Sequence, residues 1–104
     1  MLHTRIVLVD DHRILLDALK KLVEPEFEVV GAFDDGQTML ENIVSLSPDI
    51  IVLDISMPIM DGLSAGEHLK KILPKTKLVF LTSYEDKDTA AEAFKLGASG
   101  YVLK

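Results

Sequence analysis

Four short runs of the sequence are apolar at nearly every position, and this pattern restricts the fold more than any other feature. The runs cover residues 6–9, 27–30, 50–53 and 78–81, and a shorter run follows at 101–103. Strands without polar alternation are covered on both faces, as parallel strands in α/β proteins are. The five runs therefore predict a buried parallel sheet.

The segments between these runs change to helical spacing, with apolar residues three or four positions apart. Helix limits are expected from capping residues, glycine and proline. The expected helices are residues 13–23 with Pro25 beyond the end, 36–46 between Asp35 and Pro48, 62–73 between Gly62 and Pro74, and 90–96 with Asp86 or Asp88 as N-cap and Gly97 after the end. The first helix is expected to bury one apolar face: Ile14, Leu15, Ala18, Leu19, Leu22 and Val23.

The resulting order, βαβαβαβαβ, predicts a single α/β domain with a doubly wound parallel sheet. The flavodoxin-like strand order 2-1-3-4-5 would leave the first helix alone on one face of that sheet. A chain of 104 residues with 48% hydrophobic content has room for one compact domain with one core.

Composition removes several classes of protein. The chain has no cysteine, which excludes disulfide scaffolds, thiol catalysis and Cys-ligated metal sites. Its net charge of −6 disfavours nucleic acid as a partner of these residues. No apolar run approaches the roughly 20 residues of a membrane helix, and the N-terminus lacks the pattern of a signal peptide. We therefore expect a cytoplasmic location and no membrane contact.

Polar residues follow four of the predicted strands directly. Asp10 and Asp11 follow the first, Asp54 the third, Thr82 ends the fourth and Lys104 follows the last. Because the carboxyl ends of parallel strands meet at one edge of the sheet, these side chains are expected to converge there. Clustered carboxylates require a cation and suit Mg²⁺, while a lysine and a hydroxyl suit an anionic phosphoryl group. Asp54 is the candidate nucleophile.

A purely structural interpretation exists for each residue taken alone. Asp11 can cap the first helix, Asp54 can form a turn, and Lys104 can be a solvated terminus. The joint occurrence at four strand ends favours a site. His12 is interpreted as a first-turn residue of the helix rather than a ligand, because imidazole is a poor ligand for Mg²⁺.

Four motifs together resemble a bacterial response-regulator receiver domain. They are Val-Asp-Asp-His at 9–12, Leu-Asp-Ile-Ser-Met-Pro at 53–58 with Met-Asp-Gly at 60–62, Leu-Thr-Ser at 81–83, and Gly-Ala-Ser-Gly-Tyr-Val-Leu-Lys at 97–104. The resemblance covers the whole chain and is strongest to the NarL/FixJ (LuxR-type) subfamily. It implies a CheY-like form of the flavodoxin-like fold.

The resemblance also implies roles for particular residues. Asp54 would accept a phosphoryl group from the phosphohistidine of a sensor histidine kinase. Asp10, Asp11 and Asp54, with the backbone carbonyl of Ser56, would bind Mg²⁺. Such a domain is a phosphoacceptor with at most slow self-phosphorylation and autodephosphorylation, and is not a turnover enzyme.

A second group of residues would respond to the phosphate. Thr82 and Lys104 would hold phosphoryl oxygens, and movement of Thr82 would draw Tyr101 inward as a switch.

Receivers of this subfamily continue into a fifth helix and a C-terminal DNA-binding output domain. We therefore expect residues 1–104 to be a receiver domain truncated before that helix, with no DNA-binding domain, so that DNA is contacted only through a part outside these residues. Without the packing of that fifth helix, apolar residues of the first helix would be exposed. The exposed residues would favour self-association or a homodimer. The residues concerned are Ile14, Leu15, Ala18 and Leu22.

Two rival functions fit the pattern less well. A phosphohydrolase of the haloacid dehalogenase type also uses a strand-end Asp with Mg²⁺, but it needs a second Asp two residues later, where this chain has Ser56. A nucleotide-binding protein of the Rossmann or P-loop type needs a glycine-rich phosphate loop. The sequence has no G-x-G-x-x-G after the first predicted strand and no G-x-x-x-x-G-K-[ST].

Overall fold

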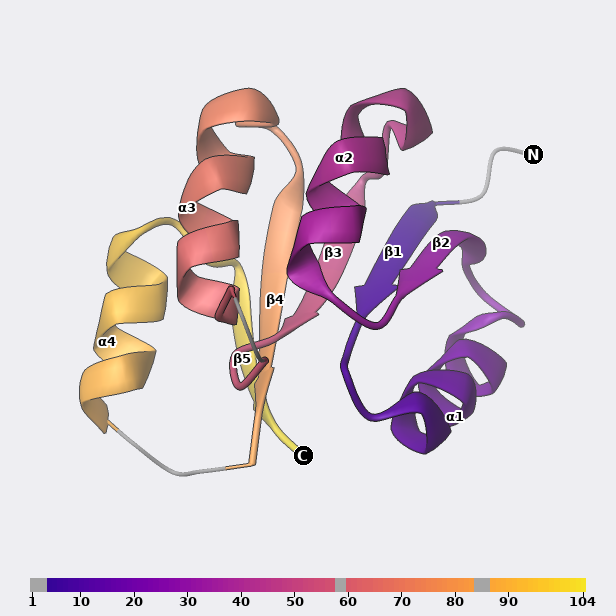
Figure 1. The fold of residues 1–104 in the computed structure, drawn as a ribbon, viewed down its shortest axis with the longest axis horizontal. Coiled ribbons are helices and arrows are strands. Elements are labelled where there is room, and N and C mark those ends of the chain that lie inside the picture. The colour runs from indigo at the N-terminus through magenta and orange to yellow at the C-terminus, as the bar shows by residue number, and fades with distance from the viewer. Residues whose placement is uncertain (1–3, 58–59, 84–86) are drawn as a thin grey trace.

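A five-stranded, fully parallel sheet forms the centre of the molecule (Figure 1). It is seen in a computed structural model that describes residues 4–57, 60–83 and 87–104. The strand order β2-β1-β3-β4-β5 confirms the predicted flavodoxin-like topology. The strands are β1 (Arg5–Val9), β2 (Glu28–Phe33), β3 (Ile50–Asp54), β4 (Lys77–Thr82) and β5 (Gly100–Leu103).

Four helices connect the strands in the described residues: α1 (Arg13–Val23), α2 (Gly36–Leu46), α3 (Gly62–Ile72) and α4 (Lys87–Lys95). Asp35 and Asp61 cap α2 and α3 by accepting hydrogen bonds from the backbone N–H groups of Thr38 and Ser64. None of these helices is long and apolar enough to cross a membrane.

The residues at the two ends of α4 test the predicted start and stop signals of this helix. Gly97 follows this helix with φ of +110°, the conformation expected of a glycine that ends a helix. Asp88 lies inside the first turn of α4 and is therefore not its N-cap, which corrects one of the two capping candidates. The other candidate, Asp86, lies outside the described residues.

The two faces of the sheet are covered unequally. The main core lies between one face and helices α2, α3 and α4, with Met39, Ile43, Leu69 and Phe80 among its fully buried side chains. A smaller cluster, built on Ile6 and Leu8, lies between the other face and α1, which stands by itself beside β1 and β2 in Figure 1. The prediction that α1 is alone on its face is confirmed for the described residues.

The predicted core face of α1 was partly wrong. Leu16, which the prediction did not include, is the buried residue of this helix and packs on Ile6 and Leu8. Leu19 and Val23 pack against the same cluster as predicted, and Ile14 and Leu22 are 89% and 75% exposed, as expected for this helix without the packing of a fifth helix. The helix has two neighbouring apolar stripes, and sequence periodicity cannot say which of them meets the sheet. Leu16, Leu19 and Val23 form the stripe on the sheet, whereas Ile14, Ala18 and Leu22 form the exposed one.

The expectation that every strand is covered on both faces also needs correction. Strand β2 is an edge strand without a fully buried residue, and Ile50, Val52 and Val79 on the inner strands are only half-buried. The reason is that, among the described residues, α1 is the only helix packed against this face.

The loop after β3 folds back onto the strand at a glycine. The backbone N–H of Gly62 donates to the carbonyl of Ile55 at 2.8 Å. A Cβ at position 62 would collide with the backbone carbonyl oxygen of Asp54 and would lie 2.7 Å from the Cα of Ile55. This close approach of two backbones requires glycine.

We therefore expect Gly62→Ala to lower the free energy of unfolding by about 1–3 kcal/mol, because the backbone around Asp54 has to shift. Urea unfolding followed by circular dichroism measures the change. Gly100→Ala is the matched control, since its Cβ would meet Val79 at an ordinary 3.4 Å. Equal stability of the two variants would contradict the close approach.

Candidate functional site

The carboxyl ends of four neighbouring strands meet at one edge of the sheet. Backbone hydrogen bonds of the sheet continue one residue beyond the strands and hold the chain there. The N–H of Asp10 donates to the carbonyl of Phe33 at 3.0 Å, and the N–H of Lys104 donates to the carbonyl of Thr82 at 2.7 Å. Residues 94 positions apart in the sequence are brought together in this way, as predicted.

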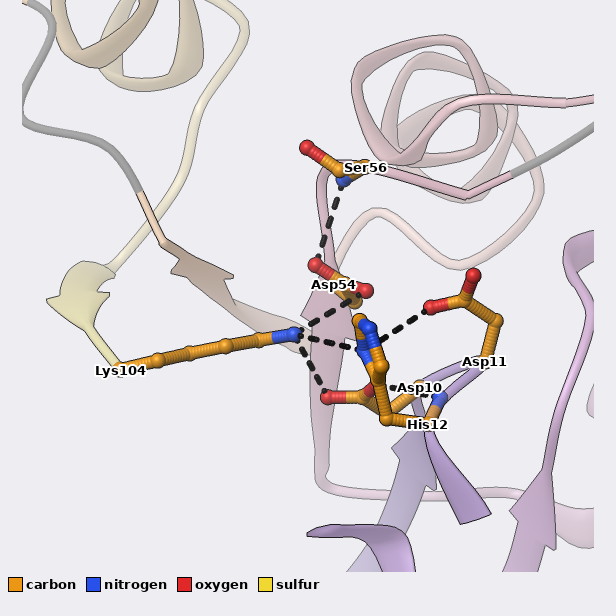
Figure 2. Close-up of polar contacts among 6 residues, drawn as sticks. All are labelled: Asp10, Asp11, His12, Asp54, Ser56 and Lys104. Carbon is orange, nitrogen blue, oxygen red and sulfur yellow. Dashed lines mark hydrogen bonds and ion pairs between the residues drawn. The ribbon is translucent and has the colours of Figure 1, made fainter.

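Lys104 joins two of the predicted acidic residues. Its Nζ lies 3.1 Å from Oδ2 of Asp10 and 3.2 Å from Oδ2 of Asp54 (Figure 2). Both aspartates are fully buried, and the lysine side chain is only 12% exposed. The ammonium therefore lies between two carboxylates that would otherwise repel each other without water to screen them.

The buried position changes the acidity of these groups. Burial, reinforced by the negative charge of Asp10, raises the pKa of Asp54 to about 6, although Lys104 opposes the shift. For Lys104, burial by itself lowers the pKa, but its hydrogen bonds and charge interactions with Asp10 and Asp54 outweigh burial and raise it. One ammonium thus faces more carboxylate charge than it neutralises.

The donor set fits a metal ion. Buried oxygens of Asp10 and Asp54 share the single ammonium of Lys104, and a buried oxygen of Asp11 lies 3.3 Å from the ring of His12. The three aspartates and His12 offer one ligand atom each, and these four atoms all lie within 4.8 Å of one another. Hard carboxylate oxygens in excess of the neighbouring positive charge are what a divalent cation requires.

Two backbone N–H groups orient the aspartates. The backbone N–H of His12 donates to Oδ1 of Asp10 at 2.9 Å, and the backbone N–H of Ser56 donates to Oδ1 of Asp54 at 3.2 Å. Ser56 itself is exposed, and the predicted role of its carbonyl as a metal ligand stays a prediction.

His12 lies in the site, which the sequence interpretation did not foresee. It occupies the N-cap position directly before α1 with an extended backbone, rather than the first turn, and its side chain makes no capping hydrogen bond. Its ring contacts Asp10 and Asp11 instead. The only sequence signal for a place in the site was that His12 directly follows Asp10 and Asp11. The residue type argued against such a place, because imidazole is a poor ligand for Mg²⁺.

Thr82 lies on the strand next to that of Asp54, and Tyr101 lies one strand further away, on β5. Thr82 is buried at the end of β4, which pairs with β3 on one side and β5 on the other. Tyr101 packs against the main core, 6.3 Å from the ring of Phe94, and its hydroxyl is buried without a hydrogen bond to any described residue. Their roles in phosphate binding and switching stay predictions.

The raised pKa of Asp54 gives a testable dependence on pH. A carboxyl whose pKa moves from 3.8 to about 6 on folding holds its proton more tightly in the folded state, so stability falls as pH rises through this interval. Asp54→Asn removes that cost. In the presence of a metal chelator, we expect Asp54→Asn to raise the free energy of unfolding by about 1–3 kcal/mol above pH 6. The gain should vanish toward pH 4.

Urea unfolding across this pH range measures the effect, with Asp17→Asn, on the exposed surface of α1, as the control. A gain that is the same at all pH values, or that appears equally in the control, would contradict the electrostatic explanation.

Comparisons with known proteins agree with this geometry. The family of response regulator receiver domains matches residues 6–104. The chain is 37% identical over 102 residues to the transcriptional regulatory protein DegU of Brevibacillus brevis, a match that covers 96% of this chain and 43% of DegU. The chain spans about half the length of the first curated relatives that it matches.

Two solved structures share the fold over nearly the whole chain. The isolated receiver domain of RcsB from Salmonella enterica serovar Typhimurium, with the phosphomimetic BeF3−, superposes with a TM-score of 0.92 at 27% identity, covering 99% of this chain and 78% of that one. A LuxR-family two-component response regulator from Aurantimonas sp. SI85-9A1 also gives 0.92, at 32% identity, covering 99% and 75%. The chain therefore belongs to the response regulator receiver domain family, with relatives of the NarL/LuxR type.

Proposed function

We propose that this chain is a phosphorylation-controlled signalling module in which Asp54 accepts the phosphoryl group. The observation that carries the proposal is the contact of Lys104 Nζ with the buried carboxylates of Asp54 and Asp10, at 3.2 and 3.1 Å. An ammonium held beside a nucleophilic carboxylate also lies where the negative charge of a phosphoryl group would develop.

The donor is a phosphohistidine of a sensor histidine kinase. A carboxylate oxygen of Asp54 attacks phosphorus, the P–N bond breaks, and the electron pair leaves with the imidazole of the kinase. The attacking carboxyl has to be ionised, and a pKa of about 6 leaves most of it ionised at neutral pH. Burial keeps the carboxylate poorly solvated, which favours its use as a nucleophile.

Asp10, Asp11 and Asp54, with the backbone carbonyl of Ser56, would hold Mg²⁺. When bound, the ion neutralises charge on the phosphoryl oxygens and on the attacking carboxylate. The assignment is supported by the buried carboxylate oxygens of Asp10, Asp11 and Asp54, which gather around one ammonium and carry more negative charge than it neutralises. Asp10 and Asp54 also need a cation because they approach each other while fully buried.

Thr82 and Lys104 would hold the phosphoryl oxygens. Movement of Thr82 would then draw Tyr101 inward. An aspartyl phosphate adds up to about two negative charges and strong acceptor oxygens, enough to bias a local equilibrium of a few kcal/mol. Thr82 ends the strand beside Asp54, and Tyr101 pairs with the same strand from β5. The buried hydroxyl of Tyr101, unpaired among the described residues, gains a hydrogen bond in any alternative position that offers a partner.

In the whole protein, residues 1–104 would be the receiver that controls a C-terminal transcriptional output domain, and only that domain would contact DNA. The curated relatives about twice as long, which include transcriptional regulators, support this proposal. The exposed apolar residues Ile14 and Leu22 on α1 support a covering element there, either a further helix or a second copy. The module would act in the cytoplasm and would not turn over a separate substrate.

We expect a small phosphodonor, acetyl phosphate, to transfer one phosphoryl group to Asp54 in the presence of Mg²⁺. Intact-mass measurement should show the mass of one phosphoryl group added to the wild type and to the control Asp17→Asn, but not to Asp54→Asn. A folded wild type that gains no mass, or an Asp54→Asn variant that does, would refute the proposal. Multiple turnover on a generic phosphate ester would favour the phosphohydrolase instead.

A further inference from the structure

The ring of His12 occupies a place beside the acidic pair that the proposed function leaves unexplained. Its Nδ1 lies 3.1 Å from Oδ1 of Asp10 and 3.3 Å from Oδ1 of Asp11, and Figure 2 shows the ring among Asp10, Asp11 and Lys104. The Nζ of Lys104 lies 3.5 Å from the same nitrogen. The imidazole therefore faces into the carboxylate cluster, although 62% of the side chain is exposed.

The local backbone holds the ring in this place. The N–H of His12 donates to Oδ1 of Asp10, so the oxygen that faces the ring also anchors the backbone from which the ring projects. The side chain makes no capping bond to α1, which leaves its nitrogen atoms free of the helix. The orientation of the ring is thus tied to Asp10, a fully buried residue, rather than to the exposed helix surface.

The distances match the edges of a metal coordination shell. Around an ion with ligands at about 2.1 Å, neighbouring donors of an octahedron lie about 3.0 Å apart and opposite donors about 4.2 Å apart. The two distances from Nδ1 to the carboxylate oxygens are close to the first value. The whole set of four donors spans 4.8 Å, so a small inward movement brings all of them to one ion.

We propose that His12 supplies a nitrogen ligand to the metal site of Asp10, Asp11 and Asp54, and that the site therefore binds first-row transition ions more tightly than Mg²⁺. The inference rests on the metal site of the proposed function and adds one ligand to it. Oxygen-only sites suit Mg²⁺, whereas imidazole adds affinity for ions such as Co²⁺ and Ni²⁺, which follow Mn²⁺ in the order of increasing affinity.

His12→Phe tests the inference, because phenylalanine keeps a flat ring at this position but has no nitrogen. Calorimetric titration of metal-free protein with MgCl2, MnCl2 and NiCl2 at one neutral pH should show a loss of about tenfold or more in Ni²⁺ affinity, a smaller loss for Mn²⁺, and less than about threefold for Mg²⁺. His68→Phe, at an exposed position on α3, is the matched control and should change none of the three.

A spectroscopic measurement separates ligation from a structural role. Pulsed electron paramagnetic resonance of the Mn²⁺ complex should show coupling to a ¹⁴N nucleus in the wild type and in His68→Phe, and none in His12→Phe. Absence of that coupling in the wild type, or an equal loss of affinity for all three ions, would overturn the inference and leave His12 as a hydrogen-bond donor to the carboxylates.

Failure of this inference is distinguishable from failure of the proposed function. Wild-type protein that is phosphorylated on Asp54 with Mg²⁺, but shows no nitrogen coupling with Mn²⁺, refutes only the role of His12. Wild-type protein that binds none of the three ions refutes the metal site itself.

Discussion

The ammonium of Lys104 between the carboxylates of Asp10 and Asp54 is the interaction on which the whole site depends. It connects the residue after β5 to the ends of β1 and β3, and its side chain has to cross the end of β4 to do so. Strand β4 ends there in Thr82, which is followed by Ser83. The three charged groups are almost withdrawn from water, so each one determines the ionisation of the others. A phosphoryl group or a divalent ion entering this site changes that balance directly.

Unequal coverage of the sheet gives the two faces of the molecule different properties. Helices α2, α3 and α4 bury the central strands on one face, among them β3 and β4, which carry Asp54 and Thr82. On the other face, α1 covers β1 and β2 and leaves inner-strand residues such as Val79 half-buried. The exposed stripe on α1 begins at Ile14, two residues after His12, so the apolar surface adjoins the site. A partner that covers this surface therefore also comes close to the acidic site.

Most of the fold was predictable because its signals are local. Asp35 and Asp61 cap helices, Gly97 ends one with a positive φ, and the apolar runs are strands within one to three residues of the expected limits. The sheet order and the convergence of Asp10, Asp54 and Lys104 followed from the handedness and connectivity of parallel strands. The prediction was wrong where two interpretations of a local pattern fitted the sequence equally well. The helix α1 has two apolar stripes, and only contact with Ile6 and Leu8 selected the one that contains Leu16.

The sequence by itself determined the topology, the edge of the sheet where the site lies, and the acidic residues that meet there. These follow from periodicity and from the rule that parallel strands end at one edge, both of which a chain carries in its order of residues. Only the tertiary structure decided how buried each carboxylate is, that Lys104 contacts two of them at once, and that the His12 ring turns toward Asp10 and Asp11 rather than away. Burial and distance set the charge interactions, and both depend on side chains packed from distant parts of the chain, which no local pattern specifies.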